Sequence, residues 1–514
     1  MPEAALVNVI HGRELERGFE RSCDVLVIGS GAAGAVIAAE LAEAGQEVVV
    51  VEEGAYVPAA EYGRMRPSQS MRHLWRDAGL TFALGIGNSP AINVMMGRCV
   101  GGSSVATGGV CFRIPSAVLH DWSTRLGLRE LDERAMEPCF SEVEQRIHVE
   151  EVPVEARSRS TQLFALGAAA LDHPLKPLRR NTKNCNGCGR CNFGCPHGSK
   201  LSVDVTYLPR ALAAGATLYS DCAVDRLTID RDRVTGATGR VLDGPRARTR
   251  GRFAVRARRV VLSAGAYASP LLLMKSGLGR GRSGQIGRNL TLHPGFRVMA
   301  RFDELVQGWK GALQSAYSDA FERERITLVG LFVPPGVLAA TLPGIAESHA
   351  RSAAGIPELC VFGGMLHDDA GGTVHSVLGR PLMTYRLSAA DRAAVPTLMR
   401  RMAEIWFAAG ARSVFLPVLG LGPVDRDRLR SLDLEHIPAH RLECASQHPL
   451  GTCRMGTSAA DSVVDPDGQA WELRELFVAD GSILPTSLGV NPQLSIMSMA
   501  TRIAWKLRER RLPD

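Results

Sequence analysis

Residues 23–54, CDVLVIGSGAAGAVIAAELAEAGQEVVVVEEG, predict a strand, a glycine-rich turn, an amphipathic helix and a second strand. Gly29, Gly31 and Gly34 form the pattern G-x-G-x-x-G between the first strand and the helix. Glycines at this spacing permit a tight turn and let the backbone approach a pyrophosphate, whose charge is favourable at the helix N-terminus. Glu52 ends the second strand, where a carboxylate can accept hydrogen bonds from ribose hydroxyl groups. The stretch therefore predicts an α/β fold that binds a dinucleotide.

The acidic residue at position 52 narrows the choice of dinucleotide. A carboxylate there disfavours a ribose that carries a 2′-phosphate, so the pattern favours FAD or NAD over NADP. The less favoured alternative is a glycine-rich turn in some other α/β fold.

The composition is typical of a soluble globular protein. The chain has 514 residues, of which 45% are hydrophobic and 22% charged, and this length predicts two or more domains. No apolar run reaches the ~18 residues that a membrane helix needs, and residues 1–22 show no secretory signal, so we expect a cytoplasmic protein without an integral membrane segment. The net charge is +7 and the basic runs are short, which disfavours nucleic-acid binding.

Four of the twelve cysteines lie close together in NCNGCGRCNFGCPHGSK, residues 184–200. Their spacing, C-x2-C-x2-C-x3-C-P, is that of bacterial iron–sulfur proteins. The four candidate ligands are Cys185, Cys188, Cys191 and Cys195. Three interpretations stay open: a [4Fe–4S] or [3Fe–4S] cluster, a zinc site, and a loop whose cysteines are reduced or locally disulfide-bonded and serve the fold alone.

Several further stretches resemble the signatures of the glucose–methanol–choline (GMC) oxidoreductases, a family of flavoproteins. They are GRCVGGSSVATGGVCFR (97–113), GAYASPLLLMKSGLG (265–279), GQIGRNLTLHPG (284–295), SQHPLGTCRMG (446–456) and LFVADGSILPTSLGVNPQLSIMSMA (476–500). They occur in the order typical of the family and extend over most of the chain. The resemblance selects FAD from the two dinucleotides that the first motif allows.

The resemblance implies a Rossmann-like FAD-binding domain, of the type shared with p-hydroxybenzoate hydroxylase, and an α+β substrate domain with an antiparallel sheet. The FAD-binding domain would be discontinuous and comprise residues 20–61, 86–115, 196–300 and 441–514. The substrate or cap domain would comprise residues 62–85, 116–180 and 301–440, with the Cys-rich loop at 181–200.

The resemblance also places the cofactor residue by residue. FAD would lie across Gly29, Gly31, Gly34 and Glu52, with the loop Gly101, Gly102 and Ser103 near the isoalloxazine, the backbone of Val224 near the adenine, and Asp480 and Gly481 at the pyrophosphate–ribityl region. Members of the family that hold their flavin covalently have a histidine in the loop after Gly102, whereas this chain has Ser103 to Ala106, so we expect non-covalent FAD. Thr107 stands where the family usually has Asn.

His448 and Asn491 match the active-site His/Asn pair found in the cholesterol- and choline-oxidising branches of the family. Oxidation of an alcohol requires loss of the hydroxyl proton while hydride leaves carbon for flavin N5. A neutral histidine can take that proton, and an asparagine can orient the oxygen without titrating. We therefore expect His448 to act as the base and Asn491 to position the substrate.

The predicted function is the FAD-dependent oxidation of a hydrophobic alcohol, either aliphatic, aromatic or steroid, to a carbonyl compound. The pattern is closest to the cholesterol-oxidase-like and long-chain-alcohol-oxidising branch, which has a Cys-rich loop. A cluster in this loop would favour a dehydrogenase that passes electrons to a quinone or a redox protein, and its absence would favour an oxidase that makes hydrogen peroxide. The alternative from another class is a lyase, because some plant hydroxynitrile lyases share this fold and bind FAD without redox turnover.

Overall fold

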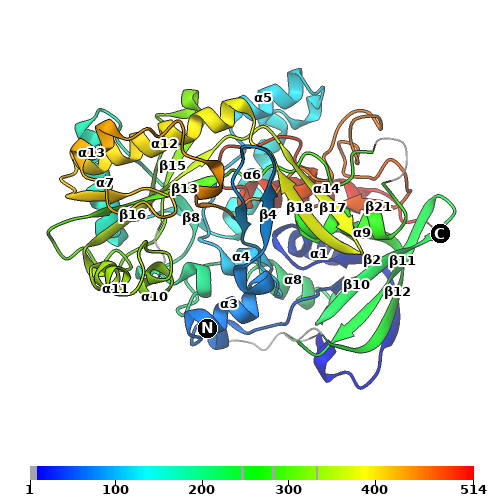
Figure 1. Ribbon diagram of the computed structural model, residues 1–514. Coiled ribbons are helices and arrows are strands. Elements are labelled where there is room, and N and C mark those ends of the chain that lie inside the picture. The colour runs from blue at the N-terminus through cyan, green and yellow to red at the C-terminus, as the bar shows by residue number, and fades with distance from the viewer. Residues whose placement is uncertain (1–7, 245–247, 280–283, 332–333, 514) are drawn as a thin grey trace.

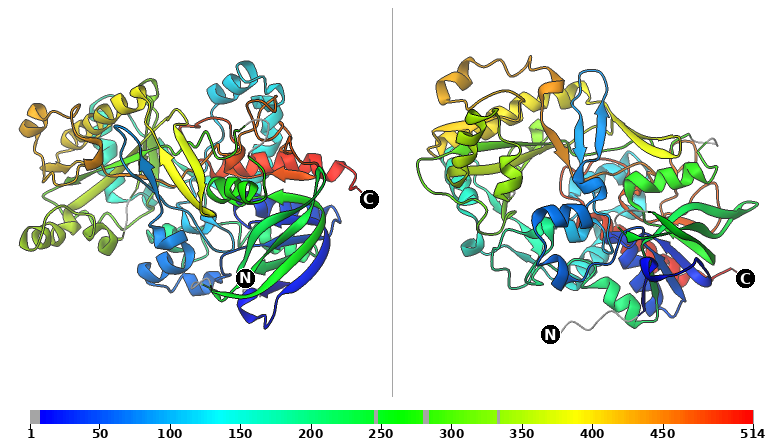
Figure 2. Two further views of the ribbon diagram at one scale, coloured as in Figure 1. Left: turned by 45° about the vertical axis from the view of Figure 1, so that its right-hand side comes forward. Right: turned by 60° about the horizontal axis from the view of Figure 1, so that its bottom comes forward.

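The computed structural model describes residues 8–244, 248–279, 284–331 and 334–513. Most of the strands belong to two large sheets that lie in different halves of the molecule (Figures 1 and 2). A short two-stranded sheet pairs β6 (Val149–Glu151) with β8 (Arg179–Asn181).

The first sheet contains the predicted dinucleotide motif at its centre. In spatial order its strands are β1 (Val9–His11), β9 (Thr217–Ser220), β3 (Val48–Val51), β2 (Phe19–Ile28), β12 (Thr249–Leu262), β11 (Arg233–Leu242) and β10 (Cys222–Asp230), and β21 (Leu476–Val478) also pairs with β12. The pairs from β1 to β12 and the β12–β21 pair are parallel, whereas β10, β11 and β12 form an antiparallel meander. The predicted strand, turn, helix and strand are thus confirmed as β2, α1 (Ala32–Glu43) and β3.

Burial on both faces explains why β2 and β3 read as continuous apolar runs. All four valines of β3 and the last four residues of β2 are buried, as expected for parallel strands that are covered on both sides. Helix α1 packs on α14 (Gln493–Glu509) and on α8 (Tyr207–Ala213), so the C-terminal helix covers the segment that begins the fold.

The second sheet is mixed, which differs in part from the antiparallel sheet that we expected. In spatial order its strands are β17 (Gly372–Val377), β18 (Arg380–Tyr385), β4 (Phe82–Gly85), β5 (Ile92–Val94), β20 (Cys444–Ser446), β13 (Gly295–Arg301), β16 (Leu359–Leu366), β15 (Ile326–Gly330), β14 (Ala316–Ser318) and β7 (Lys176–Pro177), with β19 (Ser413–Phe415) paired to β13. The β4–β18 and β5–β20 pairs are parallel. In both pairs a strand of the hairpin at residues 82–94 meets a strand that comes from much later in the chain.

Helices cover the second sheet on the side away from the first. The long helix α12 (Ala389–Ala408) contacts β13, β16 and α7 (Arg159–Ala170). Its start is specified by a capping box, in which Ser388 and Asp391 each accept the other's backbone N–H. The remaining α-helices are α2 (Ala59–Tyr62), α3 (Pro67–Leu74), α4 (Ser103–Ala106), α5 (Ser116–Thr124), α6 (Glu133–Arg146), α9 (Gly265–Lys275), α10 (Pro335–Ala339), α11 (Glu347–Ala354) and α13 (Arg426–Ser431).

Among the described residues, no helix is both long and apolar enough to span a bilayer. The domain boundaries given above stay a prediction.

Candidate functional site

A cavity of about 620 Å³ lies along the first sheet, beside the glycine-rich turn. Of the predicted site residues, those that line it are Gly29, Gly31, Glu52, Gly102, Ser103, Val224, His448, Asp480 and Gly481. The structure thus brings together residues that are up to 452 positions apart in sequence, between Gly29 and Gly481. Gly34, Gly101 and Asn491 do not line the cavity, although each lies next to a residue in or against it.

The three glycines of the turn have different roles. Gly29 has a φ of 101°, a left-handed conformation that favours glycine. A Cβ on Gly34 would lie 2.0 Å from the Gly29 carbonyl oxygen, so Gly34 lets α1 pack directly on the turn. A Cβ on Gly31 would meet only the Gly102 Cα atom, at 3.9 Å, and would otherwise project into open space. That space, at the N-terminus of α1, fits a pyrophosphate group.

Glu52 is held rigidly at the edge of this cavity. Its carboxylate accepts hydrogen bonds from the Ser30 backbone N–H at 2.9 Å, the Ser30 hydroxyl at 2.9 Å and the Gly54 N–H at 2.8 Å. Burial raises the pKa of this carboxyl, and the three donors oppose that shift. The cavity lining at Val224 belongs to β10, which starts directly after β9, the neighbour of β3.

Asp480 is similarly fixed on the opposite side of the turn. It accepts from the Gly265 N–H at 2.8 Å, the Ser269 hydroxyl at 2.5 Å and the Ser482 N–H at 2.7 Å. These contacts join β21, α9 and the segment that leads to α14. Burial raises the pKa of the Asp480 carboxyl.

The start of α14 supplies a further polar group beside the cavity. Pro492 and Ile496 line it, and the Nε2 atom of Gln493 is buried without a hydrogen-bond partner among the described residues. Thr107 donates to Gln493 Oε1 at 3.4 Å, so the threonine that departs from the family pattern contacts this amide. Two helix N-termini, a rigid carboxylate and an unpaired amide donor fit a flavin dinucleotide.

His448 contacts two other side chains that are candidates for the chemistry. Its Nε2 atom lies 3.0 Å from Asn491 Nδ2, and its Nδ1 atom lies 3.3 Å from Nδ1 of His293. The predicted His/Asn pair is therefore in direct contact, although the two residues are 43 positions apart. His293 was not expected from the sequence. Its only signal was its place in TLHPG, residues 291–295, within one of the motifs that resemble the family.

The hydrogen bonds of His293 determine where the imidazole hydrogens lie. Its Nε2 atom accepts from the backbone N–H groups of Leu488 at 3.0 Å and Gly489 at 3.2 Å. A neutral His293 must then carry its hydrogen on Nδ1 and donate it to Nδ1 of His448. His448 consequently carries its own hydrogen on Nε2. Exchanging the oxygen and nitrogen positions of the Asn491 amide lets Oδ1, which is buried without a partner among the described residues, accept that hydrogen.

Both imidazoles are held neutral. Burial, together with the nearby His367, lowers the pKa of His293 to about 3. Burial, together with His293, lowers the pKa of His448 well below 6.5. A neutral His448 is required for proton uptake, so the site satisfies one condition of the predicted role.

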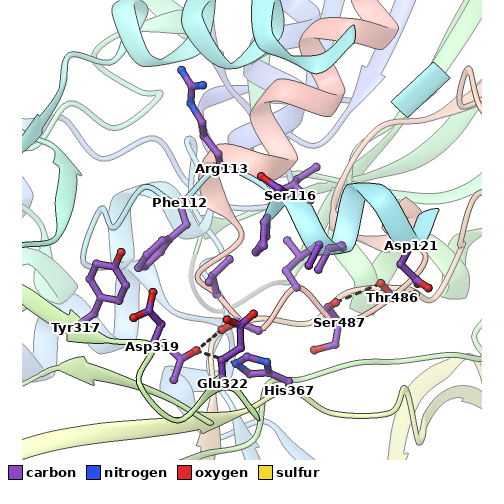
Figure 3. A pocket seen from close by; sticks show the side chains of 18 of the residues that line it. Phe112, Arg113, Ser116, Asp121, Tyr317, Asp319, Glu322, His367, Thr486 and Ser487 are labelled. Carbon is purple, nitrogen blue, oxygen red and sulfur yellow. Dashed lines mark hydrogen bonds between the residues drawn. The ribbon is translucent and has the colours of Figure 1, made fainter. Parts of the chain in front are cut away.

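A second, more open cavity of about 1090 Å³ lies between α5, the second sheet and residues 485–490 (Figure 3). Phe112 and Tyr317, whose rings pack edge to face at 4.9 Å, lie toward one end, and Asp121 and Thr486 toward the other. Charged side chains from several elements also line this cavity: Arg113, Glu133, Glu137, Lys176, Arg179, Asp319 and Glu322.

Residues 488–492 lead from the second cavity to the first. Leu488, Gly489 and Val490 line the former, whereas Pro492 lines the latter. Thr327 on β15 fixes this segment by donating to the Gly489 carbonyl at 3.0 Å, and the same hydroxyl lies 2.8 Å from His367 Nε2. The second sheet thereby holds the segment that carries Asn491.

The Cys-rich loop does not form a metal site among the residues that the structure describes. No group of three or more His, Cys, Asp or Glu side chains is placed to hold a metal ion there, and Cys185, Cys188, Cys191 and Cys195 are free thiols. The described residues therefore give no support to either metal interpretation of the spacing. Cys191 and Cys195 are buried, whereas Cys185 and Cys188 are partly exposed.

Two buried cations join this loop to the cavity instead. Arg180 donates to Cys191 Sγ at 2.9 Å and to the Gly108 carbonyl at 2.8 Å. Lys200 donates to the carbonyls of Val105 at 2.5 Å, Thr107 at 2.7 Å and Cys191 at 3.0 Å. Burial favours a higher pKa for the Cys191 thiol, but Arg180 and Lys200 outweigh it and lower that pKa. The loop thus supports α4 and the residues that directly follow it.

We expect protein purified without oxygen to contain no iron and no zinc. The double variant Cys185→Ser/Cys188→Ser should keep its flavin and its activity. Lys200→Met should instead destabilise the protein by about 3 kcal/mol, because three carbonyls lose their donor. Metal analysis, flavin absorbance and thermal unfolding measure these effects. Stoichiometric iron in the parent protein that is absent from the double variant would show that the loop holds an iron–sulfur cluster.

Comparison with known proteins agrees with this arrangement. Two family models described as GMC oxidoreductase match residues 23–295 and 373–500. A GMC-type oxidoreductase of Mycobacterium tuberculosis is 36% identical over 487 residues, which cover 94% of this chain and 75% of that protein. The long-chain-alcohol oxidase FAO1 of Arabidopsis thaliana is 27% identical over 526 residues, covering 96% of this chain and 67% of that protein.

Solved structures share the fold at low sequence identity. Pyridoxine 4-oxidase from Mesorbium loti superposes with a TM-score of 0.72 at 19% identity, covering 95% of this chain and 100% of that one. A variant of Aspergillus oryzae formate oxidase superposes with a TM-score of 0.73 at 16% identity, covering 95% and 98%. The predicted fold class is thereby confirmed.

Proposed function

The chain belongs to the GMC oxidoreductase family, and we propose that it is an alcohol oxidase that acts on a hydrophobic alcohol. Its family and its relatives make it an FAD-dependent oxidoreductase acting on CH–OH groups. The substrate class, the electron acceptor and the roles of individual residues are part of the proposal. The proposal rests on the contact between His448 and Asn491. This contact lies beside a cavity that the glycine-rich turn, Glu52 and Asp480 also line.

FAD, when bound, supplies an acceptor for two electrons in the form of hydride. We assign its pyrophosphate to the turn at Gly31, a ribose to Glu52, and its ring system to the end of the cavity that His448, Pro449 and Pro492 line. This placement puts His448 at the ring end of the cavity, where the alcohol carbon must lie.

His448 and Asn491 together bind the oxygen of the alcohol. Asn491 orients this oxygen, and His448 takes the hydroxyl proton at Nε2 as the carbon gives up hydride, leaving a carbonyl compound. In the resting arrangement Nε2 already carries a hydrogen, so proton uptake begins with a change of tautomer. In this change the contact between Nδ1 of His448 and Nδ1 of His293 breaks.

Two observations support a hydrophobic substrate and an oxidase. Several relatives over more than nine-tenths of the chain are long-chain-alcohol oxidases, and Phe112, Ile114 and Leu488 offer apolar surface in the second cavity. Because these relatives are described as oxidases, we propose molecular oxygen as the acceptor. Oxygen takes two electrons and two protons and becomes hydrogen peroxide.

The test is anaerobic mixing of the holoprotein with a panel of alcohols. A long-chain primary alcohol should bleach the visible flavin band, and admission of oxygen should restore it with one hydrogen peroxide per alcohol oxidised. Bleaching that only a quinone or redox protein reverses would contradict the oxidase. A flavin that stays oxidised with every alcohol, while cyanohydrins are cleaved, would instead establish a lyase.

The pH dependence follows from the lowered pKa of His448. Proton uptake requires neutral His448, and burial and His293 hold its pKa well below 6.5, so we expect the anaerobic rate of flavin reduction to persist as the pH falls through 6.5 and to decline only at lower pH. Flavin content must be measured at each pH, because buried neutral histidines also reduce folding stability as the pH falls below about 6.5. A decline centred near 6.5 at constant flavin content would contradict this environment for His448.

A further inference from the structure

Exposed apolar side chains gather on one part of the second sheet. Of the fifteen large hydrophobic side chains that are exposed among the described residues, seven lie on β4, β17 and β18 or directly beside them. These seven are Leu80, Phe82, Leu84, Ile86, Val377, Leu378 and Leu382, and we call them the apolar face. The three strands are adjacent at one end of the sheet (Figure 1).

The strand register puts these side chains on the same side. Ala83 pairs with Met383, and Met383 pairs with Val374, and all three are buried. Because side chains alternate along a strand, Phe82, Leu84, Leu382 and Val377 point away from the core. An edge of a sheet with an apolar outer face is a surface that proteins normally cover or make polar.

Leu378 lies at the tip of the apolar face, where both its exposure and its backbone conformation are unfavourable for a leucine. It is 99% exposed and begins the two-residue loop that joins β17 to β18. Leu378 and Gly379 have φ angles of 50° and 73°, a conformation in which Asn or Asp before Gly is strongly favoured over a leucine. A leucine here costs both backbone strain and exposed apolar area, which suggests that the tip inserts into an apolar environment.

The charges around the apolar face are mainly positive. Residues 78–94 contain no ionisable side chain, and residues 372–385 contain His375 and Arg380 but no acid. Lys275 lies at the tip, since a Cβ on Gly379 would be 3.7 Å from its Cε atom. The hollow that Gly379 and Lys275 line also contains two further cations and two acids: Arg226, Arg252, Glu20 and Asp225. The nearest acid in sequence, Asp77, is exposed beside Leu80 and accepts from the Thr81 hydroxyl at 3.2 Å.

The apolar face also adjoins the proposed active site. Arg380 and Pro381, which follow the tip, line the same cavity as His448, and β17 and β18 pack on α9. A surface held against this face would therefore lie beside the part of that cavity that Arg380 and Pro381 line. Long-chain and steroid alcohols partition into lipid, so a bilayer held on this face would concentrate them beside the protein.

We propose that the apolar face docks on the interfacial region of a lipid bilayer that contains anionic lipids. Apolar side chains with flanking Arg and Lys match such an interface, in which the leucines enter the acyl boundary and the cations contact lipid headgroups. A second copy of the chain fits less well, because residues 78–94 and 372–385 of that copy contain no acid that could pair with Arg380 and Lys275. The docking itself is independent of the proposed function, but its use in substrate delivery rests on it.

The test is cosedimentation of the FAD-loaded full chain with vesicles of phosphatidylcholine, alone or with phosphatidylglycerol. We expect binding to the mixed vesicles that weakens in high salt and is smaller with phosphatidylcholine alone. The variant Leu84→Asp/Leu378→Asp should bind mixed vesicles at least about tenfold more weakly, because two apolar side chains no longer leave water. The matched control is Leu305→Asp/Ile345→Asp, which replaces side chains that are 72% and 87% exposed elsewhere and should bind like the parent chain.

Activity on a short, water-soluble alcohol separates docking from catalysis and from folding. Both variants should keep this activity and their flavin content, and only the apolar-face variant should lose activity on a long-chain alcohol supplied in vesicles. The proposal is overturned if the parent chain stays in the supernatant, if both variants bind alike, or if the face instead forms a dimer that the Asp variant dissociates. Absence of alcohol oxidation with intact vesicle binding would contradict the proposed function but leave the docking surface standing.

Discussion

His448→Ala should slow the anaerobic reduction of the flavin by an alcohol by about 10²–10⁴-fold, the range typical of a lost general acid–base group. The variant removes both the proton acceptor and the partner of Asn491 and His293. The measurement is the stopped-flow rate of loss of the visible flavin band at saturating alcohol. Asn491→Ala should have a smaller effect that falls partly on KM, because Asn491 orients the oxygen without taking the proton.

The matched control for His448→Ala is His440→Ala, which removes an exposed imidazole from the same region of the chain. It should react at the parent rate. Both proteins must bind the same amount of flavin and unfold at similar temperatures for the comparison to stand. A His448→Ala variant that reduces its flavin within a few-fold of the parent rate would remove His448 from the chemistry.

Gly31→Val should lower the affinity for FAD by about 100-fold or more, which corresponds to about 2.8 kcal/mol, and should leave the apoprotein folded. Gly31 has a φ of −68°, which any residue can adopt, and a Cβ there meets no atom closer than 3.9 Å. The added side chain would occupy the space that we assign to the pyrophosphate. FAD titration of apoprotein, followed by flavin fluorescence, measures the affinity.

Gly34→Val provides the contrast to this variant. A Cβ at position 34 would lie 2.0 Å from the Gly29 carbonyl oxygen, so the protein itself must distort and should unfold at a lower temperature even without FAD. Loss of FAD without loss of stability in Gly31→Val, and loss of both in Gly34→Val, would separate cofactor contact from packing. Unchanged FAD affinity in Gly31→Val would move the pyrophosphate away from this turn.

The dinucleotide fold could be predicted from local sequence because each of its requirements is local. Gly29 needs a left-handed backbone, Gly34 needs close contact within its own turn, and β2 and β3 need apolar residues on both faces. These demands leave a pattern within 32 residues, 23–54. The pair His448 and Asn491 could be named from family-like motifs, but only the folded chain puts their side chains in contact.

The Cys-rich loop shows what the spacing of its cysteines alone leaves open. Its spacing is that of a cluster ligand set, but ligation requires the thiols to converge, and convergence depends on what else the loop contacts. Arg180 and Lys200 bind Cys191 and the carbonyls of residues 105, 107 and 108, so the loop supports α4. Both partners lie outside the Cys motif or at its edge, so the motif could not predict them.

By itself, the sequence determined the βαβ core, the dinucleotide turn and the family. These features depend on steric and apolar requirements of residues that are close together in the chain, so the requirements are visible as short sequence patterns. Only the tertiary structure decided the neutral state and hydrogen placement of His448, the contacts of Cys191 with Arg180 and Lys200, and the apolar face on β4, β17 and β18. His293 acts on His448 from 155 residues away, and β4 meets β18 across about 300 residues. Contacts over such separations depend on how whole segments pack against one another, and a short sequence pattern cannot predict that packing.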